Sequence, residues 1–197
     1  MKQPKNYKNT QGYDEFEPLA LGGHICKIVK VKEQQSRTGK DMIVIALDIA
    51  EGEQKDYYAE QYKKDSRPID QKKWGCVVYQ LIEDKDGNTN RGFKTFINAV
   101  AKSNKGFDES TIWDDNFCEY FKDKLVGGVF GREQYRSNQS GELRWSTKCI
   151  AFRDIETIKK GVDIPEDRYL PEAQPGKATM FDMFDNAQPV DEDDIPF

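Results

Sequence analysis

Apolar and polar residues alternate with the period of a β-strand in several stretches of the chain. The clearest is residues 42–49 (MIVIALDI), where every second side chain from Ile43 to Ile49 is apolar and falls on one face. Residues 24–34 are rich in β-branched side chains, and a turn at residues 36–40 follows, so these stretches predict a long hairpin. Three further strands are predicted at residues 74–83, 124–135 and 143–152, the last two joined by a hairpin loop at residues 137–141.

One stretch instead has the period of an amphipathic helix. In residues 92–102 the apolar side chains Phe93, Phe96, Ile97 and Val100 are spaced so that they share one face, which predicts a helix packed on the core. Shorter segments predict a helix or ordered loop at residues 57–64, a helical turn at 117–121 and a closing helix at 153–160.

This order of elements predicts a mainly β fold. Five strands with one helix between the third and fourth is the order of an OB-fold, a small, partly open five-stranded barrel. Residues 19–164 would form this domain. The glycine-rich run at residues 127–131 lies within the fourth strand, where glycine marks a bend, a bulge or a close approach.

Both ends of the chain differ from this body. Residues 1–18 are polar and irregular and predict a flexible arm. Residues 165–197 contain five of the eight prolines and no sustained apolar period, which predicts a disordered tail. The tail carries nine acidic and two basic residues, whereas residues 1–164 carry 26 acidic and 28 basic ones. The net charge of −5 therefore comes from the tail.

Composition narrows the class of protein. The four cysteines stand singly and His24 is the only histidine, so no metal site is expected. The thiols are interpreted as small core residues of a reducing cytosol, and a Cys–His nucleophile pair using His24 stays open. No apolar run is long enough to span a membrane and no secretory signal is visible at the start, which predicts a cytoplasmic protein. We expect no enzyme activity and no cofactor; a metal-dependent nuclease is a lesser alternative.

The chemistry we expect is nucleic-acid binding. Single-strand binding needs cations that follow the phosphates and aromatic rings on which bases stack. Both hairpins and the third strand offer such residues: Lys27, Lys30, Lys32, Arg37, Lys40, Trp74, Tyr79, Arg132, Tyr135, Arg136, Arg144, Trp145 and Lys148. For each of them an ordinary solvated position or a core position is the competing interpretation. Trp145 in particular shares a face with Leu143 and could belong to the core.

The end of the tail predicts a second site. Four consecutive carboxylates precede an apolar tip, in which Pro196 favours an extended backbone at Ile195. The terminal ring could enter an apolar pocket of a partner while the acids steer the encounter. The partner-docking residues are Asp191, Glu192, Asp193, Asp194, Ile195, Pro196 and Phe197.

Two resemblances sharpen these expectations. The last five residues, DDIPF, are identical to the tip of bacterial single-stranded-DNA-binding proteins, which docks replication, recombination and repair proteins. The body resembles a family of phage-encoded single-stranded-DNA-binding proteins. The stretches that carry this likeness are residues 22–31 (GGHICKIVKV), 48–52 (DIAEG), 96–107 (FINAVAKSNKGF), 124–131 (KLVGGVFG), 147–149 (TKC) and 164–166 (IPE).

The resemblance implies a single-stranded-DNA-binding protein of phage or prophage origin, located in the host cytoplasm. It would coat single strands during replication and recombination without strict sequence specificity, recruit partners through its tip, and possess no catalytic residues. A homo-oligomer is compatible with this function. The alternative is a protein-interaction module or DNA mimic that competes for host repair and replication proteins, and the nearly neutral body keeps this alternative open.

Overall fold

The structure is a computed structural model that describes residues 2, 3, 5, 7, 17–137 and 140–170. Its elements, in chain order, are β1 (Gly22–Gln35), β2 (Asp41–Ile49), α1 (Tyr57–Lys64), the 3-10 turn η1 (Ile69–Gln71), β3 (Val77–Leu81), α2 (Arg91–Ser103), the 3-10 turn η2 (Phe117–Phe121), β4 (Leu125–Arg136), β5 (Leu143–Arg153) and α3 (Ile155–Lys160).

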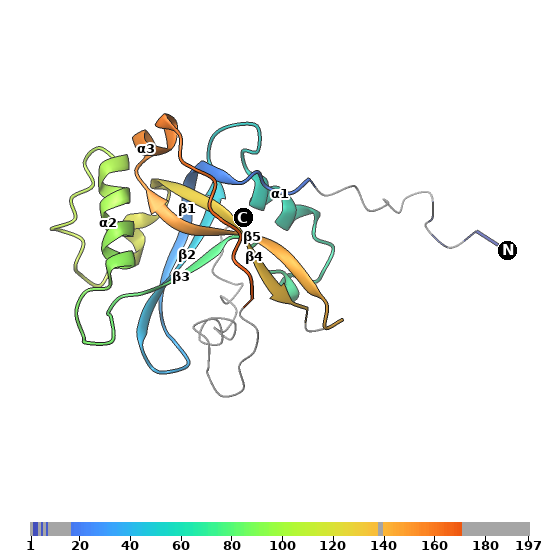
Figure 1. Cartoon of the computed structure of the whole chain (residues 1–197), viewed down its shortest axis with the longest axis horizontal. Coiled ribbons are helices and arrows are strands. Elements are labelled where there is room, and N and C mark those ends of the chain that lie inside the picture. Colours follow the sequence, from blue (N-terminus) through green and yellow to red (C-terminus); the bar gives the residue numbers. More distant parts are fainter. Residues whose placement is uncertain (1, 4, 6, 8–16, 138–139, 171–197) are drawn as a thin grey trace.

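The five strands form one antiparallel sheet in the order β3-β2-β1-β4-β5. β1 lies at its centre and pairs with β2, while residues 22–27 of β1 also pair with β4. The outer half of β4 continues beyond β1, and β5 is the strand with which it pairs there, so these two strands form a projecting hairpin (Figure 1). The edge strands β3 and β5 contact each other, but no hydrogen-bonded ladder joins them in the described part of the chain.

The mainly β fold with a helix between the third and fourth strands is therefore confirmed. The predicted barrel is not confirmed, because the sheet is open. One reason is the length of β3, which is five residues where the sequence predicted ten. The indole N–H of Trp74 donates to the carbonyl of Leu47 at 2.7 Å. That side-chain bond occupies an acceptor that a longer third strand would use for its own backbone.

The core lies between the sheet and α2, which covers one flank of it (Figure 1). The apolar face predicted for this helix is confirmed, because Phe93, Phe96, Ile97 and Val100 are all at most 3% exposed. The ring of Phe96 packs 5.2 Å from that of Phe121 and 4.9 Å from that of Phe152, measured between centroids. Burial of these rings is the main source of stability in this half of the molecule.

A buried carboxylate connects the sheet to α1. Asp48 on β2 is 2% exposed and accepts hydrogen bonds from the backbone N–H groups of Ile49, Tyr58 and Ala59 at 2.8, 2.9 and 3.2 Å. Two of these donors belong to the first turn of α1, whose N–H groups have no partner within the helix. Asp48 therefore caps a helix that begins nine residues further along the chain. Burial raises the pKa of its carboxyl, and the hydrogen bonds oppose that rise.

The glycine-rich run in β4 allows a close approach, as predicted. A Cβ atom on Gly127 would lie 2.7 Å from the carbonyl oxygen of Arg153, and one on Gly128 would lie 3.0 Å from the Sγ of Cys26. The ladder between β4 and β5 is irregular between Val129 and Phe130. Gly127 and Gly128 thus have no room for a side chain, and the ladder irregularity that often accompanies glycine lies immediately after them.

The cysteines are core residues in three cases out of four. Cys26, Cys76 and Cys149 are buried, Cys118 is half-buried, and all four are free thiols. The ring of His24 contacts Phe130 edge-on, with centroids 5.4 Å apart, and its Nε2 lies 2.8 Å from the carbonyl oxygen of Ala20. His24 is thus engaged in packing, and the thiol of Cys26 lies 3.7 Å from its backbone carbonyl oxygen.

Candidate nucleic-acid interface

The segment that follows α3 runs beside the outer half of β4. We call residues 165–170 the strap. The N–H of Arg168 donates to the carbonyl of Arg132 at 2.9 Å, and the N–H of Gln134 donates to the carbonyl of Arg168 at 2.8 Å, in a parallel bridge opposite Glu133. The outer half of β4 has no neighbour on this side once β1 has ended, and an unpaired edge readily accepts another segment. The strap therefore differs from the disorder predicted from residue 165 onwards.

Four side chains from β4, β5 and the strap form a continuous row, which we call the Trp145 row. Arg132 donates from Nε to Asp167 at 2.9 Å, and its guanidinium lies 5.3 Å from the centre of the Trp145 ring. Tyr169 meets the same ring edge-on, with centroids 5.2 Å apart and an interplanar angle of 80°. Cation–π and edge-to-face contacts of this kind orient the rings.

The Trp145 row is exposed. Trp145 is 39% and Tyr169 68% exposed. The interpretation of Trp145 as a core residue is thus wrong, because the hairpin projects beyond the core and Leu143, on the same face, is itself 50% exposed. The hydrogen bond to Asp167 raises the pKa of the Arg132 guanidinium, so this cation is permanently charged next to an accessible indole. In single-strand binding a base stacks on an aromatic ring and its phosphate contacts a cation, and an exposed ring beside a fixed cation offers both.

The pleat of the hairpin separates two aromatic residues that the sequence had suggested for one groove. Trp145 pairs with Gln134, and Arg144 pairs with Tyr135. Directly opposed residues share a face and successive pairs alternate, so Tyr135 and Arg144 lie on the opposite face from Trp145. A single groove lined by both rings is therefore wrong. Tyr135 is 40% exposed and gives the second face of the hairpin a ring of its own.

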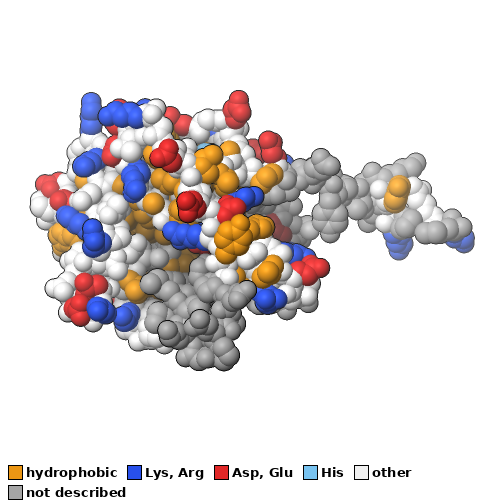
Figure 2. Space-filling model, in the orientation of Figure 1, with side chains coloured by type: hydrophobic (Ala, Val, Ile, Leu, Met, Phe, Trp, Pro, Cys, Tyr) orange, Lys and Arg blue, Asp and Glu red, His pale blue; other side chains and the backbone are white. Residues whose placement is uncertain are grey.

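The cations near the hairpin tip contact its loop. Arg136 donates from Nη1 to the carbonyl of Gly141 at 2.8 Å, and Arg144 forms an ion pair with Glu142 at 3.2 Å. Basic side chains accordingly stand among acidic and apolar ones on the face shown in Figure 2, rather than in one continuous basic patch. Phosphates would have to compete with these partners for both arginines.

A second group of predicted residues lies on one face of β1, β2 and β3. The register places Lys32, Val44 and Tyr79 in a single row across the three strands. Lys30 follows on the same face, opposite Ala46. Both lysines are half-buried, and burial raises the pKa of the Tyr79 hydroxyl. This row has a cation at one end and an aromatic ring at the other.

The remaining predicted cations lie at the ends of these groups. Lys27 is half-buried in β1 opposite Asp48, close to the start of α1. Arg37 and Lys40 are exposed in the turn between β1 and β2. Lys148 is exposed on β5, opposite Gly131 of β4. Burial raises the pKa of the Cys76 thiol to about 12, and the nearby Lys148 opposes this rise.

One predicted stacking residue is not available for stacking. Trp74 is 7% exposed, its N–H is bound to Leu47, and its ring lies 5.8 Å from that of Tyr62. Trp74 is therefore a core residue and not a surface for bases. The sequence could not distinguish these roles, because a tryptophan next to a strand suits both.

Two members of the Trp145 row, Asp167 and Tyr169, were missed by the sequence analysis. They fall in the proline-containing stretch that composition assigned to the disordered tail. The available signal was the short run Arg168-Tyr169-Leu170, in which a cation is followed by an aromatic and an apolar residue. Nothing in such a short run indicates that it pairs with the edge of β4.

Several expectations fall outside the part of the chain that the structure describes. The docking residues 191–197 and most of the arm 1–18 are outside it. At the border of the arm, the carbonyl of Glu17 accepts a hydrogen bond from the hydroxyl of Tyr57 at 3.0 Å. In the described residues no helix has the length and apolarity to cross a membrane. Among the same residues, no three His, Cys, Asp or Glu side chains are grouped so as to hold a metal ion.

The chain matches no protein-family profile, and no curated protein is significantly similar to it. The function is therefore inferred from the residues themselves.

Proposed function

We propose that this chain is a single-stranded-DNA-binding protein, of phage or prophage origin, that coats single strands during replication and recombination. It binds without strict sequence specificity, because stacking on a ring does not depend on which base is stacked. The observation that carries the proposal is the Trp145 row, in which the exposed rings of Trp145 and Tyr169 stand next to the Arg132 guanidinium.

We assign the body to the OB type. Three features support this assignment: α2 lies between β3 and β4, β1 pairs with both β2 and β4, and the edge strands β3 and β5 contact each other. A five-stranded Greek-key sheet with these connections is a partly open barrel. OB-folds commonly bind oligonucleotides over a sheet face flanked by two hairpin loops. The register places the Lys32–Val44–Tyr79 row on the face that also carries Tyr135 and Arg144, and the Trp145 row on the other face, so the two rows are separate candidate surfaces.

The tail supplies the second half of the proposed function. Its terminal residues 191–197 recruit replication, recombination and repair proteins through the acidic run and the final aromatic ring. Removal of Phe197 should leave DNA affinity unchanged or raised and abolish binding to such partners. Loss of DNA binding on removal of Phe197 would contradict this division of roles.

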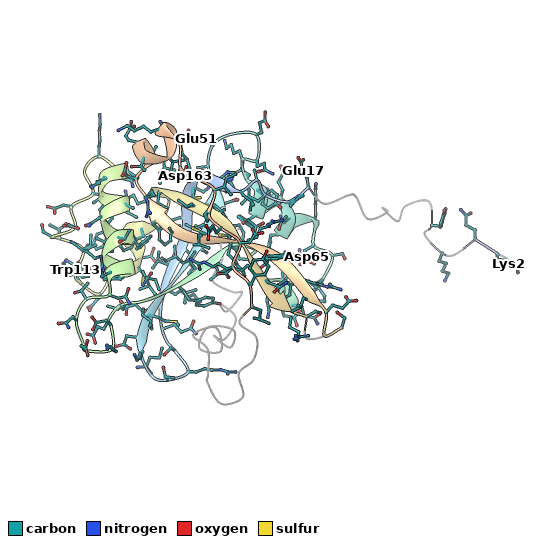
Figure 3. All side chains as sticks on the ribbon, viewed as in Figure 1. Lys2, Glu17, Glu51, Asp65, Trp113 and Asp163 are labelled. Carbon is teal, nitrogen blue, oxygen red and sulfur yellow. The ribbon has the colours of Figure 1, made fainter. Side chains whose placement is uncertain are left out.

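The fluorescence of the three tryptophans provides the test. Trp74 is buried, and Trp145 lies in the proposed site. Trp113 is exposed at one flank of the body, next to α2 (Figure 3). Titration with oligo-dT should quench the emission of the full chain, and Trp145→Phe should remove most of the quenching. The matched variant Trp113→Phe should retain it. Equal quenching in both variants, or no quenching in dilute buffer, would contradict the proposed site.

The alternative function is a protein-interaction module or DNA mimic. It is favoured by the ion pairs of the hairpin, because Arg132, Arg144 and Arg168 are each paired with a carboxylate. A module of this kind would not bind oligo-dT at any salt concentration. The same titration, performed at low and high salt, therefore distinguishes the two functions.

A further inference from the structure

The loop between α2 and η2 presents a tryptophan to solvent. Trp113 is 59% exposed, and one side of its ring stacks on Phe117, with centroids 5.4 Å apart and an interplanar angle of 22°. Phe117 is buried and packs in turn on Phe121. Trp113 is thus the outermost ring of a stack that begins in the core; the buried Phe93 also lies near it, with centroids 6.3 Å apart, and the tryptophan remains more than half exposed. Fixed, exposed rings of this type are typical centres of protein interfaces.

The surroundings of Trp113 are acidic. Residues 106–121 contain five acidic residues and no basic one. Asp114 accepts a hydrogen bond from the hydroxyl of the exposed Tyr120 at 2.8 Å, which fixes a second ring beside the first. This charge repels phosphates, so the ring is not a further platform for DNA. We call Trp113, Asp114, Asp115 and Tyr120 the acidic tryptophan patch.

The opposite flank of the molecule has the complementary character. Ile69 is 70% exposed, and residues 63–73 contain five basic and two acidic residues. One of those acids, Asp65, is already paired with Arg67 through Nη2 at 2.6 Å. We call Ile69 and the exposed Lys63, Lys64 and Lys73 the basic isoleucine patch. Figure 3 shows Trp113 at one flank of the body and Asp65, which adjoins the basic isoleucine patch, towards the other.

We propose that the acidic tryptophan patch of one copy binds the basic isoleucine patch of the next copy. A two-fold contact between identical patches would bring like charges together, whereas a head-to-tail contact brings opposite charges together. The exposed part of the Trp113 ring accepts an aliphatic side chain such as Ile69, or a lysine ammonium as a cation–π partner. Opposite charge and the fit of an aliphatic or lysine side chain to the Trp113 ring therefore both favour a second copy of this chain as the partner.

The position of the two patches determines the kind of assembly. They lie on different flanks, so each copy that is bound at one patch leaves its other patch free. Head-to-tail contacts that do not close into a ring produce an open array. The Trp145 row belongs to neither patch, so it stays accessible in the array. The contact does not require DNA and is independent of the proposed function.

Sedimentation velocity of the full chain, without DNA, tests the proposal. At low salt the sedimentation coefficient should rise with protein concentration, and high salt should suppress the rise. Trp113→Ala should weaken the association roughly thirty-fold, as for a central interface residue. The matched control Trp145→Ala removes an exposed tryptophan outside both patches and should associate like the wild type.

Two charge-reversal variants, one in each patch, provide a second test in case Trp113→Ala disturbs the fold. Asp115→Lys and Lys64→Glu should each associate weakly alone, and an equimolar mixture of the two should associate again. A wild type that stays monomeric at all concentrations would overturn the proposal. So would Asp115→Lys associating more strongly than the wild type, because that result indicates a two-fold contact between acidic patches.

Discussion

Tyr169 meets the ring of Trp145 edge-on at 5.2 Å, although Tyr169 belongs to the strap and Trp145 to β5. The two rings are neighbours because the backbone of the strap pairs with β4. The proposed DNA surface therefore ends on the segment from which the acidic tail departs. DNA bound at Trp145 would act directly on the start of that tail.

The two rings should contribute separately to DNA affinity. Replacing Trp145 or Tyr169 with alanine removes a stacking surface worth roughly 1–3 kcal/mol per base. Each variant should therefore bind oligo-dT several-fold to about a hundred-fold more weakly, as measured by fluorescence anisotropy of labelled DNA. Trp113→Ala serves as the control on a one-site oligonucleotide. An unchanged affinity of Trp145→Ala would show that the ring is not part of the site.

Asp167 should act as a competitor of phosphate. Its carboxylate holds the Arg132 guanidinium in an exposed ion pair, and such pairs are worth roughly 0.2–1 kcal/mol. Asp167→Asn should release Arg132 and raise the affinity for oligo-dT up to about five-fold, with a steeper dependence on salt. A reduced affinity would mean that Asp167 positions Arg132 for DNA instead of competing with it. Glu142→Gln is the matched comparison at Arg144.

Asp48 should make stability depend on pH. Burial raises the pKa of its carboxyl, so the folded protein holds this proton more tightly than the unfolded chain does. That stabilisation is complete below the unfolded-state pKa and is lost as pH rises through the higher folded-state value. Asp48→Asn does not titrate. The free energy of unfolding of the wild type, relative to this variant, should fall as pH is raised from about 4 and then level off.

Urea denaturation of both proteins at a series of pH values measures this difference. A difference that rises with pH would show that the three backbone hydrogen bonds to Asp48 outweigh its burial. A constant difference would show that the carboxyl has an ordinary pKa in the folded protein.

Gly127 should tolerate no side chain. An added methyl group would lie 2.7 Å from the backbone oxygen of Arg153, which cannot move without disturbing the β4–β5 ladder. Gly127→Ala should lower the free energy of unfolding by about 1–3 kcal/mol. At Gly131 the added methyl would meet only side chains, at 3.2 Å from Ile150 and Pro165. Gly131→Ala should therefore cost less, and equal costs in chemical denaturation would contradict this account.

The sequence predicted most of the fold because the signals were local. The alternation in β2 and the helical spacing of Phe93, Phe96 and Val100 each specify an element without reference to the rest of the chain. The limits of β3 were not predictable in this way. They depend on Trp74 turning inward to bind the carbonyl of Leu47, which is a tertiary contact.

The candidate site was predictable only in part, for the same reason. Charge and aromaticity indicated Arg132 and Trp145, but exposure decided between surface and core, and that depends on how far the hairpin projects. Asp167 and Tyr169 could not be found, because composition predicts disorder and says nothing about an unpaired strand edge that can order the chain. The pleat that separates Tyr135 from Trp145 became visible only from the register.

The most direct test of the central claim is the affinity of the full chain for labelled oligo-dT, measured by anisotropy at low and high salt. We expect tight binding at low salt, weaker binding as salt rises because cations such as Arg132 displace counterions from the phosphates and added salt opposes that release, and a large loss of affinity in the Trp145→Ala variant. If the wild-type protein leaves oligo-dT unbound in dilute buffer, or if Trp145→Ala binds it equally well, the account is contradicted.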